Sequence, residues 1–159
     1  MTGPLRVRGA TPADVPGVLP FVQAITRQHE ALDPARFAML PDVVARYERW
    51  LPQRATDARS VFLVAEASGG LAGFLVGTVE ASIPIYRLEE FGFIHDVWVE
   101  PAWRGQGVAR ALVTEAITRF RAIGVGQVRL ETAAGNPSAE RLFAACGFRV
   151  CTSEHLIEL

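Results

Sequence analysis

The sequence lacks the features that mark several large classes of protein. No apolar run in its 159 residues approaches the roughly 20 residues that a membrane-spanning helix requires. The formal net charge is −1, so the composition gives no reason to expect a nucleic-acid-binding surface. No repeat, linker or low-complexity stretch is visible, and no basic region followed by an apolar segment opens the chain. These absences predict one cytoplasmic domain over residues 1–159, without a membrane or nucleic-acid partner.

Cysteine is also scarce. The two cysteines, Cys146 and Cys151, lie near the C-terminus. A disulfide between them is one possibility, but two buried thiols in a reducing compartment are the favoured interpretation. No Cys/His spacing resembles a zinc site, so no metal is expected.

What the sequence does contain is a stretch typical of a strand, a turn and a helix start. Residues 94–99 are rich in β-branched and aromatic side chains, and Pro101 ends the strand. From Val108 onward, apolar residues recur at helical spacing. The helix face they form comprises Ala109, Leu112, Val113, Ala116, Ile117 and Phe120.

The turn that enters this helix predicts an anion-binding site. The first N–H groups of a helix lack intrahelical partners and carry the positive end of the helix dipole. Gly105 and Gly107 permit unusual φ angles and close approach of a ligand to the main chain. Arg104 adds a fixed positive charge with forked donors. We therefore expect residues 104–110 to bind phosphate, and pyrophosphate rather than a single carboxylate.

Two common phosphate-binding loops do not fit this turn. A Walker loop requires Gly-Lys-Ser/Thr after its glycines, and the sequence has no such triplet. A dinucleotide fingerprint beginning at Gly105 requires a third glycine where Arg110 stands. Residues 104–109, Arg-Gly-Gln-Gly-Val-Ala, instead match the pattern Arg/Gln-x-x-Gly-x-Gly/Ala. This pattern resembles the acetyl-CoA pyrophosphate loop of the GNAT N-acetyltransferase superfamily.

The expected order of elements agrees with that resemblance. Strands are expected at residues 5–9, 60–67, 71–82, 94–99, 127–133, 148–152 and 155–159. Helices are expected from Thr11, at residues 41–51, from Val108 to near Gly124, and from Asn136 to Gly147, with loops at residues 29–34 and 83–90. The order β α α β β β α β α β β with a mixed sheet is that of the α/β GNAT fold and covers residues 5–159.

A second motif is similar to one in the same superfamily. The residues Asn136-x-x-Ala139-x-x-Leu142-Phe143-x-x-x-Gly147-Phe148 resemble Asn-x-x-Ala-x-x-Leu-Tyr-x-x-x-Gly-Phe. In the family, the central strand and the next strand part at their C-terminal ends, often at a β-bulge. The pantetheine arm of acetyl-CoA bonds to strand backbone in that gap. The cofactor-binding residues implied by the resemblance are Val97, Trp98, Val99, Arg104, Gly105, Gln106, Gly107, Val108, Ala109, Arg110, Asn136, Ser138 and Phe143.

Acetyl transfer to an amine also needs a base, because an alkylamine with a pKa of about 10.4 is protonated at neutral pH. The candidates are His95, Asp96 and Glu131, and the sequence leaves the choice open. Neighbouring residues on a strand face opposite ways, so His95 and Asp96 both face the acceptor only if a bulge intervenes. Phe143 stands where the family often has a tyrosine as general acid. The thiolate would then leave unprotonated or take its proton from water or the ammonium product, with Tyr86 as an alternative acid.

The resemblance implies that the acceptor lies between the first two helices and the loop before the central strand. The residues expected to bind it are His29, Asp33, Tyr86 and Glu89. The acidic residues of this region predict a cationic acceptor, either a small amine or an amine of a peptide or protein, although a merely solvated acidic rim is the alternative. An acyl-CoA-binding sensor and an interaction module stay open as other functions. A homodimer paired through the exposed final strand is also left open.

Overall fold

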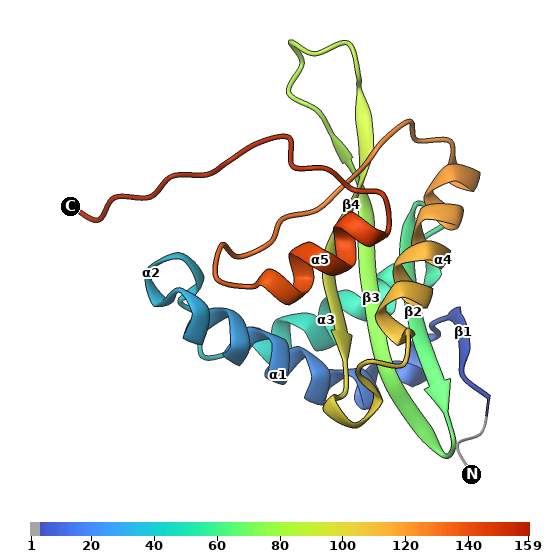
Figure 1. The fold of residues 1–159 in the computed structure, drawn as a ribbon. Coiled ribbons are helices and arrows are strands. Elements are labelled where there is room, and N and C mark those ends of the chain that lie inside the picture. The colour runs from blue at the N-terminus through green and yellow to red at the C-terminus, as the bar shows by residue number, and fades with distance from the viewer. Residues whose placement is uncertain (1–3) are drawn as a thin grey trace.

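The computed structural model describes residues 4–159, and its framework is a five-stranded sheet (Figure 1). The strands are β1 (Arg6–Gly9), β2 (Ser60–Ala67), β3 (Gly70–Ala81), β4 (Glu90–Val99) and β5 (Val128–Arg129), in that order across the sheet. Neighbouring strands from β1 to β4 are antiparallel, whereas β5 runs parallel to β4. The mixed sheet predicted from the sequence is confirmed.

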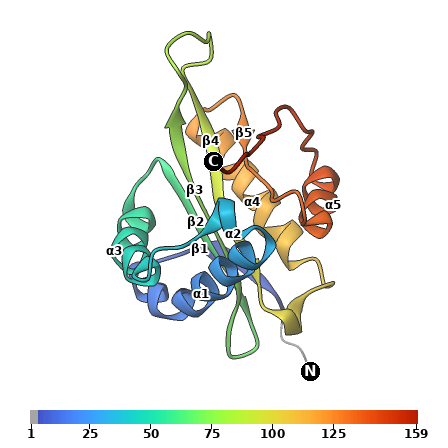
Figure 2. The same cartoon turned by 90° about the vertical axis from the view of Figure 1, so that its left-hand side faces the viewer.

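Helices cover both faces of the sheet, as Figure 2 shows. One face carries α1 (Val15–Leu32), α2 (Pro34–Phe37) and α3 (Val43–Thr56), and the other carries α4 (Val108–Ile123) and α5 (Pro137–Ala145). Two short 3-10 turns, η1 (Pro12–Asp14) and η2 (Pro101–Trp103), complete the regular elements of residues 4–159. The sheet is therefore the middle of three layers.

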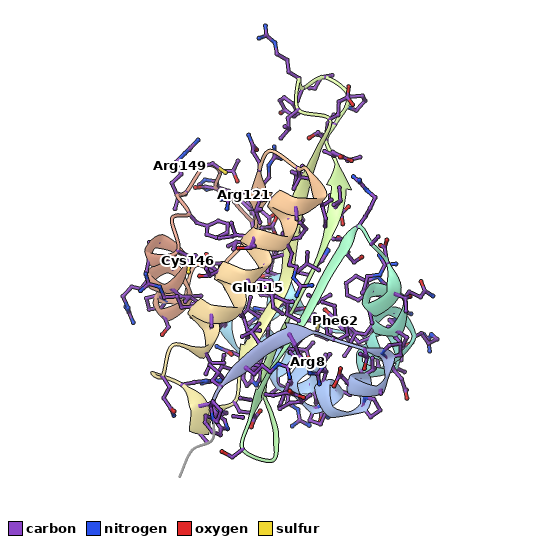
Figure 3. The ribbon with its side chains drawn as sticks, turned by 90° about the vertical axis from the view of Figure 1, so that its right-hand side faces the viewer. Arg8, Phe62, Glu115, Arg121, Cys146 and Arg149 are labelled. Carbon is purple, nitrogen blue, oxygen red and sulfur yellow. The ribbon has the colours of Figure 1, made fainter. Side chains whose placement is uncertain are left out.

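Each face of the sheet has its own hydrophobic cluster. The predicted apolar face of α4 is confirmed, because Leu112, Val113, Ala116 and Phe120 are all fully buried against the sheet. In the view of Figure 3, α4 crosses the sheet with Glu115 and Arg121 along it and Cys146 at the end of α5. The cluster on the opposite face comprises Ala10, Val15, Val18, Phe21, Val22, Leu51, Phe62, Val64, Phe74 and Val76. Burial of this apolar surface holds the three layers together.

Pro16 and Pro20 predict an irregular or split helix after Thr11, but α1 is continuous from Val15 to Leu32. Pro16 lies in its first turn, where a missing N–H costs little, but Pro20 lies inside the helix. Val18 and Val22 are fully buried, so packing of this stripe sustains the helix past Pro20. The predicted loop at residues 29–34 is wrong, because α1 continues to Leu32 and α2 begins at Pro34. Likewise α3 runs from Val43 to Thr56 rather than over residues 41–51.

The central strand is also longer than predicted, whereas the strand after α4 is shorter. β4 begins at Glu90 instead of residue 94, so β3 and β4 form a long arm whose loop projects beyond the sheet (Figure 1). β5 comprises only Val128 and Arg129 instead of residues 127–133. The pairing between β4 and β5 is therefore confined to one end of β4.

The two final strands predicted at residues 148–152 and 155–159 are wrong. Gly147 ends α5 with a φ of +96°, and no residue from 148 to 159 belongs to a strand or helix. This C-terminal segment extends away from the sheet (Figure 1), and Glu154 forms an ion pair with Arg36. The two cysteines are free thiols, but only Cys146 is partly buried. Cys151 lies in this segment and is exposed, so the expectation of two buried thiols is wrong.

Two findings concern the whole of residues 4–159. None of the helices in this range is both long and apolar enough to cross a membrane. The same residues contain no group of three or more His, Cys, Asp or Glu side chains that could hold a metal ion.

Candidate functional site

The turn between β4 and α4 presents a row of unpaired main-chain N–H groups. Gly105 and Gly107 have φ angles of 73° and 82°, in the left-handed region that favours glycine. The first intrahelical bond of α4 runs from Ala111 N to Gly107 O. The N–H groups of residues 105–110 have no protein acceptor within residues 4–159. Residues 104–107 are exposed, so these donors are open to a ligand.

Arg104 has a structural role that the sequence did not reveal. Its Nε donates to the carbonyl oxygen of Val99 at 2.9 Å, and its guanidinium lies 4.7 Å from the centre of the Trp98 ring. These contacts fix the side chain across the end of β4. The two terminal nitrogens of Arg104 have no hydrogen-bond partner in the described part of the chain. A solvent-open depression of about 490 Å³ adjoins the turn and is lined in part by Gly107 and Arg110.

Beside this turn, β4 has an open edge. The register between β4 and β5 ends at the pair Phe93 and Arg129. β4 continues to Val99, but beyond Phe93 it pairs only with β3 among the residues described. The two parallel strands therefore part at their C-terminal ends, as the sequence resemblance implied.

The main chain of Val97 and Val99 faces this open edge. Glu100 N donates to Ala72 O at 2.9 Å, which points the Glu100 amide toward β3. Because successive main-chain groups on a strand alternate between its two edges, the amides of Val99 and Val97 point the other way. The Val99 carbonyl is already occupied by Arg104. The Val97 N–H and C=O and the Val99 N–H are the groups that an extended ligand would meet.

A bulge in β4 turns two neighbouring side chains to the same face of the sheet. Val76 pairs with Asp96 and Gly77 pairs with Ile94, so His95 has no partner in the register. Both His95 and Asp96 contact α3. The Asp96 carboxylate bonds to Tyr47, and the His95 ring packs edge-on against Trp50 with centroids 5.5 Å apart. The bulge that the sequence analysis required for His95 and Asp96 to share one face is therefore present.

Asp96 is the more deeply buried of this pair. Its residue exposure is 7%, and its Oδ2 accepts a hydrogen bond of 2.7 Å from the Tyr47 hydroxyl. Burial raises the pKa of Asp96 to about 6, although the bond from Tyr47 lowers it. Burial, together with the neighbouring Asp96 charge, also raises the pKa of Tyr47. The sequence analysis did not identify Tyr47, because a tyrosine among apolar residues at helical spacing is typical of simple packing.

His95 is more accessible and lies among polar and aromatic side chains. Its side chain is 30% exposed, and Nε2 lies 2.7 Å from Thr78 Oγ1 and 3.5 Å from Glu80 Oε1. The Phe93 ring stands 5.0 Å from the imidazole, centre to centre. Burial lowers the pKa of His95, and the nearby Glu80 carboxylate opposes that shift. Thr78 and Glu80 were also missed, since no sequence pattern links them to the central strand.

Glu131, the third candidate base, lies apart from this cluster. Its side chain is 72% exposed, and its Oε2 lies 3.8 Å from the guanidinium of Arg36 in α2. Within residues 4–159 it has no hydrogen bond to His95 or Asp96. The structure brings together two of the three predicted bases.

The four residues predicted to bind the acceptor do not form one cluster. His29 stacks on Phe37 with ring centres 5.1 Å apart, and burial lowers its pKa. Asp33 caps α2, because its Oδ1 accepts from Arg36 N at 3.2 Å. Tyr86 and Glu89 belong to the projecting loop between β3 and β4, and Tyr86 is 61% exposed.

The residues predicted on α5 have mixed environments. Asn136 Oδ1 accepts from Ala139 N at 3.2 Å, so this side chain caps α5, a role that the sequence analysis did not assign to it. Ser138 is exposed in the first turn. Phe143 is half-buried against the α4 cluster, with its ring centre 5.8 Å from that of Phe148. Its ring completes an apolar wall on the α4 and α5 face.

Comparisons with known proteins identify the family to which this fold and site belong. A family model described as "Acetyltransferase (GNAT) family" matches residues 25–148. Because that match covers most of the chain, the chain belongs to the GNAT acetyltransferase family. The fold class predicted from the sequence is thereby confirmed.

Individual relatives differ in what their names say they act on. The chain is 36% identical over 112 residues to a mycothiol acetyltransferase of Sanguibacter keddieii, covering 70% of this chain and 33% of that protein. It is 29% identical over 151 residues to an aminoglycoside N(6')-acetyltransferase type 1 of Stenotrophomonas maltophilia, covering 89% and 84%. A solved aminoglycoside N-acetyltransferase in complex with CoA superposes with a TM-score of 0.72 at 14% identity, over 98% of this chain and 95% of that one.

These comparisons differ in what they say about the protein. The likeness to the solved structure concerns the fold alone. The chain spans only about a third of the length of the mycothiol acetyltransferase that it matches.

Proposed function

We propose that this chain transfers the acetyl group of acetyl-CoA to a primary amine, by direct attack of the amine in a ternary complex. The observation that supports this most strongly is the row of unpaired N–H groups at residues 105–110, beside the open edge of β4. A diphosphate satisfies such N–H groups, and an extended chain of amides satisfies an open strand edge. Acetyl-CoA joins a diphosphate to an amide-containing arm that ends in a thioester, which supplies an activated acyl group.

The residues of the α4 and α5 face fit such a ligand. On this proposal, the diphosphate lies against residues 105–110, with the terminal nitrogens of Arg104 as further donors. The pantetheine arm runs along the open edge of β4 and bonds to the main chain of Val97 and Val99. Asn136, Ser138 and Phe143 border it from α5.

Among the candidate bases, the geometry favours His95. Its side chain is accessible, and burial lowers its pKa, so the imidazole is neutral and able to accept a proton near pH 7. Asp96 is buried behind Tyr47, which suits an anchor between β4 and α3 rather than a group that meets a diffusing amine. Glu131 is held at the rim beside Arg36.

The remaining chemistry is supplied by the main chain and by the leaving group itself. The Val97 N–H on the open edge of β4 is suited to stabilise the oxyanion that forms at the thioester carbonyl. Phe143 has no proton to donate, and Tyr86 is exposed in the projecting loop. A thiol of pKa near about 8.5 departs as a thiolate without a general acid.

We propose a cationic acceptor, a small amine or a peptide amine. Glu80 supports this proposal because its carboxylate, 46% exposed, stands beside His95 where an alkylammonium would approach. The aromatic rings of Trp50 and Phe93 flank the same position and favour a cation. The acidic rim predicted from the sequence contributes less, because Asp33 caps α2. The match to an aminoglycoside acetyltransferase over most of both chains agrees with a polycationic acceptor.

A sensor that binds acyl-CoA with little turnover is the second candidate function. The observation that favours it is the phenylalanine at position 143, where the family motif often carries a hydroxyl. Titration calorimetry with acetyl-CoA, followed by turnover with a panel of amines, separates the two functions. The panel contains spermidine, an aminoglycoside, a lysine peptide and an anionic amino acid.

The choice of assay depends on the protein's own free thiols, which react with reagents that detect released CoA. Cys146 and Cys151 are free thiols, in keeping with the cytoplasmic location that we propose, and the exposed Cys151 would react with thiol reagents. Consumption of the thioester should therefore be followed by its own absorbance. The sequence contains no lysine, so acetylation of its own side-chain amines does not compete.

We expect acetyl-CoA to bind and a cationic amine to be acetylated faster than the anionic one. Binding without turnover on any amine would favour the sensor. Absence of acetyl-CoA binding would contradict both functions and leave an interaction module on this scaffold. A clear preference for the anionic amine would contradict the acceptor class.

We also propose that two copies associate through the C-terminal segment. Its large apolar side chains are unusually exposed, with Val150 at 84%, Leu156 at 50% and Ile157 at 83%. Residues 148–152 and 155–159 have strand-like composition but no strand partner within residues 4–159. The outer edge of β5 is likewise unpaired in that range. Addition of this segment to β5 of a second copy would satisfy both.

Light scattering after size exclusion tests this association. The wild-type chain should be a dimer, and Ile157→Asp should shift it toward the monomer. Leu40→Asp is the matched control, because Leu40 is also exposed, at 56%, but lies between α2 and α3. A monomeric wild type, or equal effects of both substitutions, would contradict the proposal.

A further inference from the structure

Three side chains from β3 and β4 form a short hydrogen-bonded network on the α3 face. The Thr78 hydroxyl donates to Glu80 Oε1 at 2.6 Å, and Thr78 Oγ1 also lies 2.7 Å from His95 Nε2. Thr78 is buried, whereas Glu80 is half-buried at the surface. Thr78 therefore links a half-buried carboxylate to the imidazole through the hydroxyl of a buried residue.

The proton positions in this network follow from its chemistry. A carboxylate only accepts hydrogen bonds, so the single hydroxyl proton of Thr78 points to Glu80. The Thr78 oxygen then has only lone pairs to offer His95. Its partner Nε2 must carry a proton, which leaves the lone pair of the neutral imidazole on Nδ1. Nδ1 has no hydrogen-bond partner among residues 4–159.

The packing around His95 fixes the ring in this arrangement. The bulge places the side chain on the α3 face, where Trp50 and Phe93 contact it edge-on with centroid distances of 5.5 Å and 5.0 Å. The interplanar angles are 88° and 63°. A ring held on its sides and bonded at Nε2 presents Nδ1 in a defined direction.

We infer that Glu80 and Thr78 are positioning residues that hold His95 in the Nε2–H tautomer, so that Nδ1 is the atom that removes the proton from the acceptor amine. This inference rests on the proposed acetyl transfer. Nδ1 takes one proton from the alkylammonium, and the freed lone pair forms the C–N bond as the C–S bond breaks. The sulfur leaves as a thiolate and takes its proton from solvent, while Nδ1 and the new amide nitrogen each release one proton to solvent.

The charges around His95 allow this role. Glu80 on β3 stabilises the imidazolium, whereas Arg54 on α3 disfavours it. Asp96 and Tyr47 bond to each other on the same face, and the aromatic neighbours carry no charge. Burial is the largest influence and lowers the pKa of His95. Removal of the Glu80 charge should lower this pKa further.

The tautomer is tested first, without acetyl-CoA, by nitrogen–proton correlation NMR of the three histidines. The His95 signals are assigned from a His95→Asn variant. We expect the wild type to be the Nε2–H tautomer, and Thr78→Val to be a mixture of both tautomers. An Nδ1–H tautomer in the wild type would overturn the inference whatever the activity.

Kinetics test the catalytic consequence. Thr78→Val should lower kcat/KM about tenfold or more, whereas Thr78→Ser, which keeps the hydroxyl, should stay within about threefold of the wild type. Glu80→Gln should move the acidic limb of the kcat/KM profile to lower pH. The matched controls on α4 are Thr118→Val, whose hydroxyl bonds to Thr114 O, and Glu115→Gln, whose carboxylate pairs with Arg119. Both should leave the profile unchanged.

The outcomes separate this inference from the proposed function. Turnover with an unaltered pH profile in Glu80→Gln and an unaltered rate in Thr78→Val would overturn the network and leave acetyl transfer intact. The expected tautomer without turnover on any amine would contradict the proposed function, and with it the catalytic role of Nδ1.

Discussion

The two faces of the sheet build their parts of the site from different chemical groups. On the α4 face, the groups proposed to bind the cofactor are main-chain N–H groups of one continuous segment, residues 105–110. On the α3 face, the groups of the site are side chains from three separate elements, with Tyr47 on α3, Thr78 on β3 and His95 on β4. A main-chain site depends on local backbone conformation, whereas a side-chain site depends on how distant elements pack. The first is therefore encoded in a short motif and the second is not.

The largest expected effect concerns the main-chain side of this comparison. Gly107 has a left-handed φ, so any side chain there is strained, but Asp and Asn adopt this conformation more readily than other residues and should carry a similar strain. Gly107→Asp places a carboxylate among the free N–H groups, where it repels a diphosphate. We expect acetyl-CoA affinity to fall about a thousandfold, equivalent to about 4 kcal/mol. Titration calorimetry measures this directly.

Gly107→Asn is the control for that experiment, because it has the same shape without the charge. Its loss of affinity should be at least about tenfold smaller. Equal losses in both variants would mean that space rather than charge limits binding at this turn. Unchanged affinity in Gly107→Asp would refute the assignment of the loop.

The outcome of the sequence analysis follows the same division. The glycine turn, the helix start after it and the helix that begins near Asn136 were all predicted correctly, because each depends on residues within one turn of one another. The bond from Tyr47 to Asp96 and the contacts of Thr78 and Glu80 with His95 were missed, because these residues are distant in sequence and resemble ordinary core or surface positions. The bulge at His95 could be named only as a condition, since register is a property of two strands together.

The second prediction tests the buried charge on the α3 face. The pKa of Asp96, about 6 in the folded protein, lies above its ordinary value of 3.8. Between those values the folded state binds more protons than the unfolded state, so stability falls as pH rises through about 4 to 6. In Asp96→Asn this loss is absent, while Tyr47 still has an oxygen to bond. We expect the variant to gain up to about 3 kcal/mol relative to wild type between pH 4 and 7.

Urea unfolding of both proteins across this range gives the difference. Subtraction removes the contributions of groups that the two proteins share. The pKa of His95 is lowered, so its contribution to the free energy of unfolding is lost as pH falls below the ordinary pKa of histidine. This loss is the same in both proteins. Asp14, held at a pKa of about 2 by Arg8, changes the stability of both only below about pH 4. Parallel curves would mean that Asp96 is not desolvated as the structure indicates.

A third prediction separates two uses of glycine on the α4 face. A Cβ added at Gly92 would lie 2.6 Å from Phe120 Cδ1, whereas nothing lies within 4 Å of one added at Gly107. Gly92→Ala should therefore cost about 1–3 kcal/mol of stability through overpacking. Acetyl-CoA affinity of the folded variant should stay near the wild-type value. Phe120→Leu in the same chain should recover part of the loss.

Gly70→Ala is the matched control, since Gly70 also lies in a strand and has nothing within 4 Å of an added Cβ. Its thermal midpoint should stay close to that of the wild type. If Gly92→Ala were as well tolerated, the contact between Phe120 and the β4 backbone would not be a constraint on this face.

The end of the chain was the least predictable part of the fold. Residues 148–152 and 155–159 have the composition of strands, yet they pair with no strand in residues 4–159. Composition reports what a segment tolerates, whereas pairing needs an available edge in the right place. Here the segment leaves α5 toward α2, where Arg36 pairs with Glu154, and not along β5. The local sequence pattern does not determine the direction in which this segment leaves α5.

The smallest expected effect is at Phe143, where the two faces meet the same reaction. If the thiolate leaves without a general acid, a hydroxyl at this position adds little, and Phe143→Tyr should change kcat less than about threefold at pH 7. The substitution is tolerable because the ring is only half-buried and contacts Phe148 at its edge. Phe148→Tyr, on the neighbouring ring, controls for the effect of a hydroxyl on packing. A rise in kcat of tenfold or more in Phe143→Tyr alone would show that the wild-type site lacks a general acid that it needs. Departure of the thiolate beside α5, rather than proton removal on the α3 face, would then limit the rate.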